Sequence, residues 1–392
     1  MAETRTVVIL GGSIAGLHIA HYLLKRRIAN LKVVLVTKNS HFYWNLASVR
    51  AIIPGQIQDD QILQPIATAL ARYPAASYEL VIGTAESSDF TAKTVTVAPL
   101  DGSGMRTIHY DHLVLATGAR YRTEPQTATT STAPADVPWK ASGTYEELRA
   151  LLHDTANRIA NAQTIVVAGA GPTGVEIAGE LGYEYGPRNT KRGGNPKNII
   201  LLTADAEILG GDAIAKRARA ELQKLGVTVR TGTRVNGTRV TAEGQTEVLV
   251  QEGNPIPADV YLPTLGQVPN SDFLPRDYVS ERGYVNVDQF FRVDGAESVW
   301  ALGDIVSKPR AGFFITQTQA AGVGKNLVAV LHGGQPSRIK EPPVDILACS
   351  VGRSRGVGRA GAVQLPSVLV WGVKGRHLGL PRLRSYIDGS VA

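Results

Sequence analysis

The sequence VVILGGSIAG (residues 7–16) decides the expected fold. Its apolar start is typical of a buried strand, a glycine turn follows, and an amphipathic pattern from Ser13 to about Ile28 predicts a helix. Such a helix presents unpaired N–H groups and the positive end of its dipole at one point, where a pyrophosphate usually binds. The stretch therefore predicts a dinucleotide-binding unit, with an ordinary strand–turn–helix of an α/β domain as the alternative.

The small residues of this turn have separate expected roles. Gly11 makes the turn, and Gly12 and Ser13 let the backbone approach the phosphates. Gly16 lets the helix pack against the strand, and Ser13 stands where the G-x-G-x-x-G pattern has its middle glycine.

The apolar residues 33–36 predict a second buried strand, after which this fold usually has an acidic residue that binds the ribose. Thr37 and Lys38 stand there instead. We therefore expect the hydroxyl of Thr37 to bind the ribose, with a weaker hold than a carboxylate gives.

A second copy of the pattern, TIVVAGAGPTGVE (residues 164–176), has every glycine in place. Two such units in one chain predict two dinucleotides that face one another, such as a flavin and a nicotinamide cofactor. The strand expected at 198–202 ends at Thr203, again without an acidic residue, which leaves NADPH as plausible as NADH. Basic residues that could supply charge there are Lys191, Arg192 and Lys197.

Further strands and turns fit the same organisation. The apolar strand 113–116 ends in Thr117-Gly118, and residues 123–138 predict an exposed loop. Helices are expected at 144–160 and 212–225, and strands at 78–85, 93–98 and 106–110. The strand before Gly303-Asp304 places a carboxylate at a tight turn, where it can accept a ribityl hydroxyl. A helix from Thr316 to about Leu331 would direct its dipole at the flavin.

Aromatic residues gather beside an arginine in HFYWNLASVR (residues 41–50). They suggest a lining for a planar cofactor, with Arg50 as a fork for a phosphate or carboxylate. For Phe42 and Trp44, packing into the domain is an equally good interpretation.

Composition narrows the class of protein. The chain has 392 residues, one cysteine and a net charge of +7. One cysteine excludes a redox pair, and the chain shows no spacing typical of a metal site and no nucleic-acid motif. Short apolar runs and a start without a signal peptide predict a cytoplasmic protein. Basic residues concentrate near the C-terminus: Lys374, Arg376, His377, Arg382 and Arg384. They form either a solvated surface or a peripheral contact to a membrane or an acidic partner.

The order GGSIAG, ATG, GAGPTGVEIAGE, DVYLPTLGQVPN and ALGD resembles the flavoproteins with two dinucleotide-binding domains. It is most similar to apoptosis-inducing-factor-like and ferroptosis-suppressor-like NAD(P)H oxidoreductases, which are related to type II NADH:quinone dehydrogenases. The chain departs from these families at Thr37 and Thr203, and it lacks the cysteine pair of disulfide reductases and the C-terminal amphipathic helix of the type II dehydrogenases.

The resemblance implies two sets of site residues. FAD would be held by Gly11, Gly12, Ser13, Ile14, Ala15, Gly16, Arg50, Thr117, Gly118 and Asp304, to which the strand ends read above add Thr37, Lys38 and Gly303. The nicotinamide nucleotide would be held by Gly169, Gly171, Pro172, Thr173, Gly174 and Glu176. Catalytic candidates are Glu176 near the nicotinamide, and Gln317 and Gln319 beside the flavin.

We therefore expect an α/β fold with two Rossmann-like domains, the second inserted in the first. Residues 1–122 and 285–341 would bind FAD, residues 139–284 NAD(P)H, and residues 342–392 would form a small α+β domain in which the glycine-rich segment 351–361 makes turns and bulges.

Three functions follow as hypotheses. The first is hydride transfer from NADPH or NADH to FAD and onward to a quinone-like or other small acceptor. The second is an FAD-dependent tailoring oxidase or dehydrogenase for a small organic substrate, with little or no use of NAD(P)H. The third, a redox-controlled signalling or nucleic-acid-binding flavoprotein, rests only on the basic charge. The chain would act as a monomer or homodimer.

Overall fold

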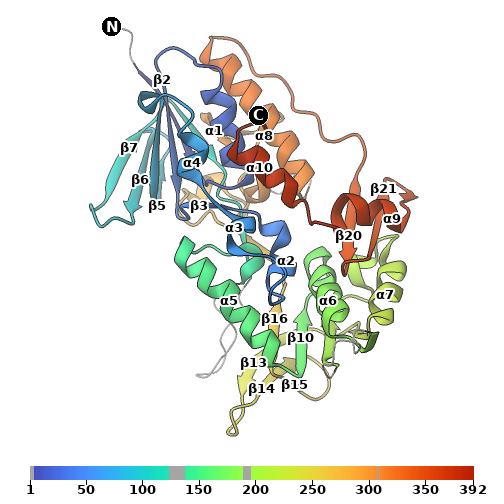
Figure 1. Ribbon diagram of the computed structural model, residues 1–392. Coiled ribbons are helices and arrows are strands. Elements are labelled where there is room, and N and C mark those ends of the chain that lie inside the picture. The colour runs from blue at the N-terminus through green and yellow to red at the C-terminus, as the bar shows by residue number, and fades with distance from the viewer. Residues whose placement is uncertain (1–3, 123–136, 189–195, 307, 309) are drawn as a thin grey trace.

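The computed structural model describes residues 4–122, 137–188, 196–306, 308 and 310–392 (Figure 1). Its larger sheet has eight strands in the order β18-β19-β8-β1-β2-β5-β6-β7. Its parallel centre comprises β1 (Arg5–Leu10), β2 (Leu31–Thr37), the start of β5 (Tyr78–Asp89), β8 (His112–Leu115) and β19 (Ala296–Ala301). Antiparallel strands at its edges are β6 (Thr94–Pro99), β7 (Arg106–His109) and β18 (Arg292–Val293).

Two helices cover one face of this sheet side by side, α1 (Ile14–Leu24) and α8 (Phe313–Leu331) (Figure 1). Val7, Val8 and Ile9 of β1 are completely buried, as expected for a parallel strand covered on both faces. Smaller elements complete this unit: β3 (His41–Tyr43), α2 (Ser48–Ala51), α3 (Asp59–Ile62), β4 (Leu63–Pro65) and α4 (Ile66–Leu70).

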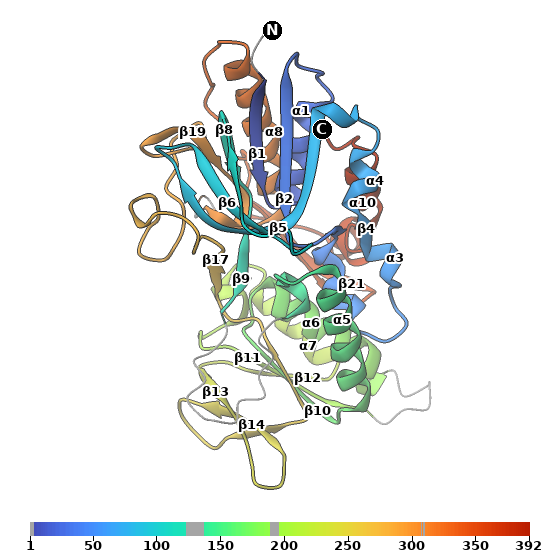
Figure 2. The same ribbon diagram turned by 90° about the vertical axis from the view of Figure 1, so that its left-hand side faces the viewer.

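The second unit has a four-stranded parallel sheet in the order β12-β11-β10-β16. Its strands are β10 (Thr164–Ala168), β11 (Asn198–Leu202), β12 (Val227–Arg230) and β16 (Val260–Pro263), and its helices are α5 (Tyr145–Asn161), α6 (Pro172–Tyr185) and α7 (Ala215–Lys224). An antiparallel sheet of β13 (Val235–Val240), β14 (Thr246–Val250) and β15 (Ile256–Ala258) lies at the end away from the first unit (Figure 2).

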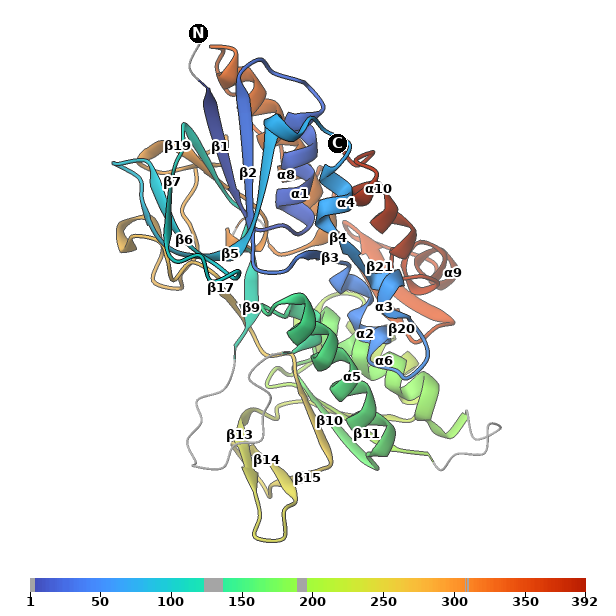
Figure 3. The same cartoon turned by 60° about the vertical axis from the view of Figure 1, so that its left-hand side comes forward.

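The second unit is inserted in the first. The chain leaves through β9 (Ala119–Tyr121) and returns through β17 (Gln267–Pro269), and these strands pair with each other between the two units (Figure 3). After the return, β19 pairs with β8 in the first sheet. This topology confirms the predicted α/β class with two Rossmann-like units.

The last segment forms a three-stranded sheet followed by short helices. Its elements are β20 (Ile346–Val351), β21 (Arg355–Ala360), β22 (Val363–Gln364), α9 (Ser367–Val370), a π-turn (Trp371–Gly375) and α10 (Leu383–Ile387). β20 packs on α6, and α10 returns to α1 and α4 in the first unit. Within the glycine-rich segment predicted as turns, most residues form a β-hairpin with its turn after Val351.

Two helices begin at other residues than the sequence predicts. α8 begins at Phe313, three residues before Thr316, and α7 begins at Ala215 after a 3₁₀ turn at Ile208–Gly211. α5 agrees with its prediction, because Thr144 and Glu147 form a capping box at its start. The predicted loop 123–138 lies mostly outside the described residues, and its end, Val137 and Pro138, is buried.

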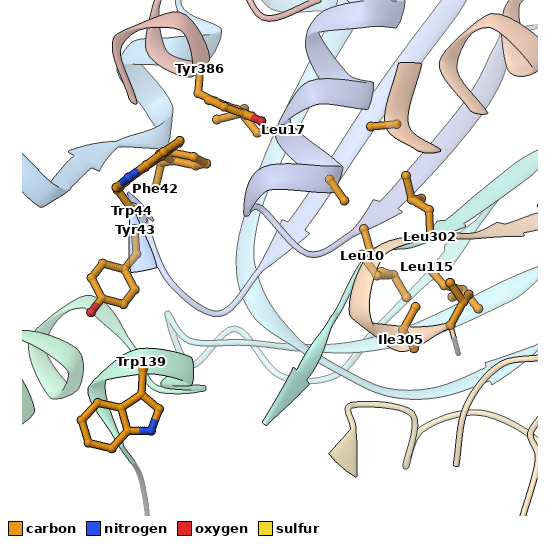
Figure 4. Packing of buried hydrophobic residues seen from close by; sticks show 14 of the residues in the cluster. Leu10, Leu17, Phe42, Tyr43, Trp44, Leu115, Trp139, Leu302, Ile305 and Tyr386 are labelled. Atoms are coloured by element: carbon orange, nitrogen blue, oxygen red, sulfur yellow. The ribbon is translucent and has the colours of Figure 1, made fainter. Parts of the chain in front are cut away.

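The core contains the aromatic residues of the segment 41–50. Phe42 and Trp44 are completely buried, and Phe42 stacks on Tyr386 from the last helix, with ring centroids 4.8 Å apart (Figure 4). For these two residues the packing interpretation is therefore correct. In the part of the chain that the structure describes, no helix has both the length and the apolar character needed to cross a membrane.

A buried histidine ties the C-terminal segment to α1. His21 has its Nδ1 atom 2.7 Å from the hydroxyl of Tyr73, and its Nε2 atom 2.6 Å from the carbonyl oxygen of Tyr386. Burial lowers the pKa of His21 to about 4, since the opposing effects of the Tyr386 carbonyl and Asp388 do not offset burial and the cations Arg72 and Lys25. The folded protein therefore holds this imidazole neutral well below its ordinary pKa.

We expect the free energy of unfolding to decrease as the pH falls through the range in which this histidine titrates. His21 takes up a proton below about pH 6.5 in the unfolded chain but only near pH 4 in the folded protein. The contribution of the neutral histidine to the free energy of unfolding is therefore complete above pH 6.5 and is lost as the pH falls from 6.5 to 4. At pH 5 the expected loss is about 2 kcal/mol. Urea unfolding at pH 7 and pH 5 should show that the difference in the free energy of unfolding between the two pH values is smaller by this amount in H21Q than in the wild type. H153Q, at an exposed histidine, is the matched control. An unchanged dependence in H21Q would contradict the prediction.

Candidate functional site

A long cleft of about 710 Å³ runs along the carboxyl ends of the first sheet. In open α/β sheets this edge is where ligands bind, and the volume is in the range of cofactor sites. Its walls come from the β1–α1 turn, the ends of β2 and β8, β5, the turn after β19 and α8. Sequence-predicted residues that line it are Gly11, Gly12, Ser13, Ile14, Ala15, Thr37, Lys38, Thr117, Gly118, Gly303 and Asp304.

The two glycine turns have the same geometry. A Cβ atom on Gly16 would lie 1.8 Å from the carbonyl oxygen of Gly11, and one on Gly174 would lie 1.8 Å from that of Gly169. Gly11 and Gly169 have φ values of +107° and +98°, which side chains rarely allow. Each helix therefore packs on its strand at a distance that only glycine permits, as the sequence predicts for both units.

Open space lies in front of both helices. Ser13 lines the cleft as the N-cap residue of α1 without capping the helix through its side chain, and a Cβ atom on Gly171 would meet nothing within 4 Å. The first N–H groups of a helix have no partner within it, so both helix starts suit a diphosphate. Pro172 begins α6, and Thr173 follows it.

One end of the cleft has the residues that we expect to bind the adenine ribose. The Thr37 hydroxyl donates to the carbonyl oxygen of Asn39 at 3.2 Å, and Lys38 lies beside it in the lining. Glu86 of β5 also lines this end. The sequence has no acidic residue directly after β2, but Glu86 brings a carboxylate to the same cleft from β5. No sequence motif includes Glu86.

The other end of the cleft has an ion pair. Asp304 binds the ammonium of Lys140, from the 3₁₀ turn Pro138–Lys140. The side chain of Gln319 accepts the N–H of Gly303 at 2.8 Å and donates to the carbonyl oxygen of Lys308 at 2.9 Å. Gln319 therefore orients the turn that carries Asp304, which is a positioning role and not the catalytic one predicted.

Arg50 does not line the cleft, so its predicted contact with FAD is corrected. Its guanidinium donates to Glu180 of α6 at 2.7 and 3.0 Å, and to the carbonyl oxygens of Gly375 and Arg376 at 2.7 and 3.0 Å. A buried cation needs a counter-charge and acceptors for its N–H groups, and the second unit and the C-terminal segment supply both.

Glu176 is also occupied by structural contacts. Its carboxylate accepts the N–H of Ser350 at 2.9 Å and pairs with Lys374 at 2.6 Å, with only 7% of the side chain exposed. The sequence placed this residue beside the nicotinamide, whereas the structure places it against the C-terminal segment. Lys374 accordingly does not belong to the solvated basic surface.

Two further predicted residues have other contacts. Gln317 donates to the hydroxyl of Tyr386 at 3.3 Å and is not part of the cleft lining. Lys197 donates to the carbonyl oxygens of Ile159, Ala160 and Ala162 at 2.6 to 2.8 Å, so its ammonium is bound at the C-terminal end of α5. Lys191 and Arg192 lie outside the described residues.

A tyrosine connects the two units at their junction. The hydroxyl of Tyr121, on β9, donates to the Thr173 hydroxyl at 2.9 Å, at the start of α6. Burial raises its pKa, while the Thr173 hydroxyl and the nearby Lys140 act in the opposite direction. Neither Tyr121 nor Lys140 belongs to a recognisable motif, and only the fold reveals that they are neighbours.

The cysteine and the remaining basic residues lie apart from the cleft lining. Cys349 is completely buried, and burial raises the pKa of its thiol to about 12. Arg376, Arg382 and Arg384 are exposed on the C-terminal segment, which also exposes Val368 and Leu369. Among the described residues, no group of three or more His, Cys, Asp or Glu is placed to hold a metal ion.

Comparisons with known proteins agree with this geometry. The sequence profile described as "Pyridine nucleotide-disulphide oxidoreductase" matches residues 5–323. The chain is 36% identical over 391 residues to "Oxidoreductase ptaL" of Pestalotiopsis fici, covering 98% of this chain and 99% of that protein.

More distant relatives confirm the resemblance seen in the sequence. "Apoptosis-inducing factor 1" of Saccharomyces cerevisiae is 25% identical, with 96% of each chain covered, and "Ferroptosis suppressor protein 1" of Taeniopygia guttata is 24% identical, with 95% and 93% covered. The solved sulfide:quinone oxidoreductase of Aquifex aeolicus has a TM-score of 0.75 at 18% identity, covering 99% of this chain and 93% of that one. This last similarity concerns the fold.

Proposed function

Since the chain belongs to the pyridine nucleotide-disulphide oxidoreductase family, we propose that it is an FAD-dependent oxidoreductase that passes a hydride from NADPH or NADH to FAD and then electrons to a quinone-like or other small acceptor. The observation that carries the proposal is the pair of glycine turns with the same close helix–strand contact, one opening onto the cleft and one facing open space at Gly171. The name of the family includes disulphide chemistry, and this chain, with one cysteine, cannot form an intrachain redox pair.

The cleft fits FAD by size and by chemistry. It would accommodate an elongated ligand, because the unpaired N–H groups of α1 lie between two ends that carry hydroxyl and carboxylate groups. When bound, FAD would supply the hydride acceptor and the two-electron chemistry.

The residues of the chain would bind and orient the cofactor. The backbone from Gly12 to Ile14 would donate to the diphosphate, and Thr37 would bind the adenine ribose. Asp304 would accept a ribityl hydroxyl, with Gln319 fixing its turn. Thr316, in the first turn of α8, would bring the positive end of that helix to the cofactor.

A second candidate has its own supporting observation. Tyr121 bonds to Thr173 at the start of α6, and Glu176 is occupied by Lys374 and Ser350. Both contacts involve residues that we expected to bind the nicotinamide nucleotide. They favour a tailoring oxidase or dehydrogenase that takes electrons from a small organic substrate and uses NAD(P)H little or not at all.

Rapid mixing without oxygen separates these two candidates. The purified protein, loaded with FAD, is mixed with NADPH and, separately, with NADH, and the flavin absorbance is followed. If the first candidate is correct, at least one nucleotide should bleach the flavin as fast as the enzyme turns over. If neither nucleotide bleaches the flavin, the first candidate fails and the second remains. A protein that takes up no FAD would overturn both.

Gly171 offers a variant that tests the second turn alone. Its Cβ would meet nothing within 4 Å, so Gly171→Ala should fold normally and retain FAD. A methyl group there would occupy the space in which a diphosphate approaches the backbone. We therefore expect the apparent affinity for NAD(P)H in the reduction assay to be about tenfold lower. Gly372→Ala, also in open space, is the matched control. Equal nucleotide affinity in both variants would contradict a nucleotide site at this turn.

A further inference from the structure

The ion pair at the far end of the cleft holds one lysine inside it. The side chain of Lys140 is 13% exposed and that of its partner Asp304 is 21% exposed, and both residues line the cleft. Burying an ammonium is costly unless a counter-charge lies close to it. The fold therefore provides for a positive charge at this place, although no sequence motif includes Lys140.

The turn that carries Lys140 is held from both units. In the first unit, the Tyr43 hydroxyl donates to the carbonyl oxygen of Pro138 at 2.8 Å, and the Asn45 amide donates to that of Trp139 at 3.3 Å. From the turn, the indole N–H of Trp139 donates to the carbonyl oxygen of Pro263, at the end of β16, at 3.1 Å. These bonds fix the backbone from which the ammonium reaches into the cleft.

Lys140 lies at the end of the cleft that is close to the start of α6, where the second glycine turn lies. Its charge and that of Asp304 both act on Tyr121, whose hydroxyl bonds to Thr173 at the start of α6. Of the ribose-binding candidates, Thr37 is the last residue of β2 and Lys38 follows it. For a hydride to pass between two bound dinucleotides, their rings must meet where the units meet. The redox ring of FAD would therefore lie at the Lys140 end.

We propose that Lys140 is a positioning residue whose ammonium lies against the redox ring of bound FAD and raises the reduction potential of the cofactor. This inference rests on the proposed function, because it requires FAD in the cleft. A hydride brings two electrons and one proton to the ring, which gains one negative charge. A fixed positive charge nearby stabilises the reduced form more than the oxidised form. Asp304 holds the ammonium in place and partly offsets its charge.

The test measures the two-electron reduction potential and the FAD dissociation constant of the loaded protein. Lys140→Met is expected to lower the equilibrium constant for reduction about tenfold, which corresponds to a two-electron reduction potential lower by about 30 mV. Lys140→Arg keeps the charge and should restore most of the potential. Lys325→Met makes the same change of net charge at an exposed position on α8, and its potential should equal that of the wild type. Asp304→Asn should move the potential upward, because it removes the partner's negative charge.

Other outcomes overturn the inference. A shift in the same direction for Lys140→Met and Asp304→Asn would mean that both act through the structure of the cleft. Weaker FAD binding in Lys140→Met with an unchanged potential would place the ammonium at another part of the cofactor. Equal potentials in Lys140→Met and Lys325→Met would remove Lys140 from any such role. A wild-type protein that binds no FAD would instead overturn the proposed function itself.

Discussion

Replacing Glu180 by glutamine is expected to lower the free energy of unfolding by about 3–5 kcal/mol. Glu180 is completely buried, and its two carboxylate oxygens accept from Arg50 at 2.7 Å and from Arg353 at 3.3 Å. Arg50 is only 8% exposed, so the amide would leave a buried guanidinium without its counter-charge. Urea unfolding followed by tryptophan fluorescence would measure the loss, since Trp371 bonds to the carbonyl oxygen of Arg353.

The matched control is Glu221→Gln, which removes a pair with Lys224 on the surface of α7. A surface pair contributes about 0–1 kcal/mol, so this variant should unfold nearly as the wild type does. If both variants lost the same small amount, the ion pair between the first and second units would not contribute to stability as its burial implies.

Replacing Gly16 by alanine is expected to weaken FAD binding at least about 100-fold, or about 2.7 kcal/mol. The new methyl carbon would lie 1.8 Å from the carbonyl oxygen of Gly11, which is backbone and cannot move aside like a flexible side chain. α1 would have to shift away from β1, and its first N–H groups would leave the position that the cleft provides. Loss of flavin absorbance on dialysis, with titration of FAD into the apoprotein, would measure the effect.

Gly174→Ala places its methyl carbon at the same distance of 1.8 Å from a backbone carbonyl oxygen, that of Gly169, in the second unit. There we expect FAD to be retained and nucleotide binding to be lost. Gly372→Ala, which meets no neighbouring atom, should change neither. Full FAD affinity in Gly16→Ala would mean that the first glycine turn does not form the binding site.

Both glycine turns were predictable because their signal is local. Each consists of an apolar run, a glycine and an amphipathic helix within about twenty residues, and the structure forms both with the same close contact. The strands β5, β6 and β7 were predictable for the same reason, since alternation and turn residues lie next to each other in the chain.

Contacts between distant residues were not predictable from one sequence. Arg50 and Glu180 are 130 positions apart, and Lys140 and Asp304 are 164 positions apart. Arg50 beside aromatic residues looked like part of a phosphate site, because the sequence contains no sign that α6 and the C-terminal segment would supply its acceptors. The contacts of Glu176 with Lys374 and Ser350 are equally distant in sequence and could not be predicted for the same reason.

The start of α8 shows a local error. Thr316 resembles a capping residue, whereas the helix begins at Phe313 after Gly312, without a side-chain cap. Thr318 in the same helix donates to the carbonyl oxygen of Phe314, four residues earlier, which is how threonine satisfies its hydroxyl within a helix. Propensity alone does not distinguish the two situations.

The insertion of one unit in the other also orders events during synthesis. The first sheet lacks β19 and the first helix lacks its neighbour α8 until the ribosome has translated the entire inserted unit, which lies between β9 and β17. At about 5–20 residues per second, the N-terminal strands wait on the order of ten seconds or longer for these partners. The inserted unit has its complete parallel sheet earlier, so the nascent chain is expected to finish its middle before its beginning.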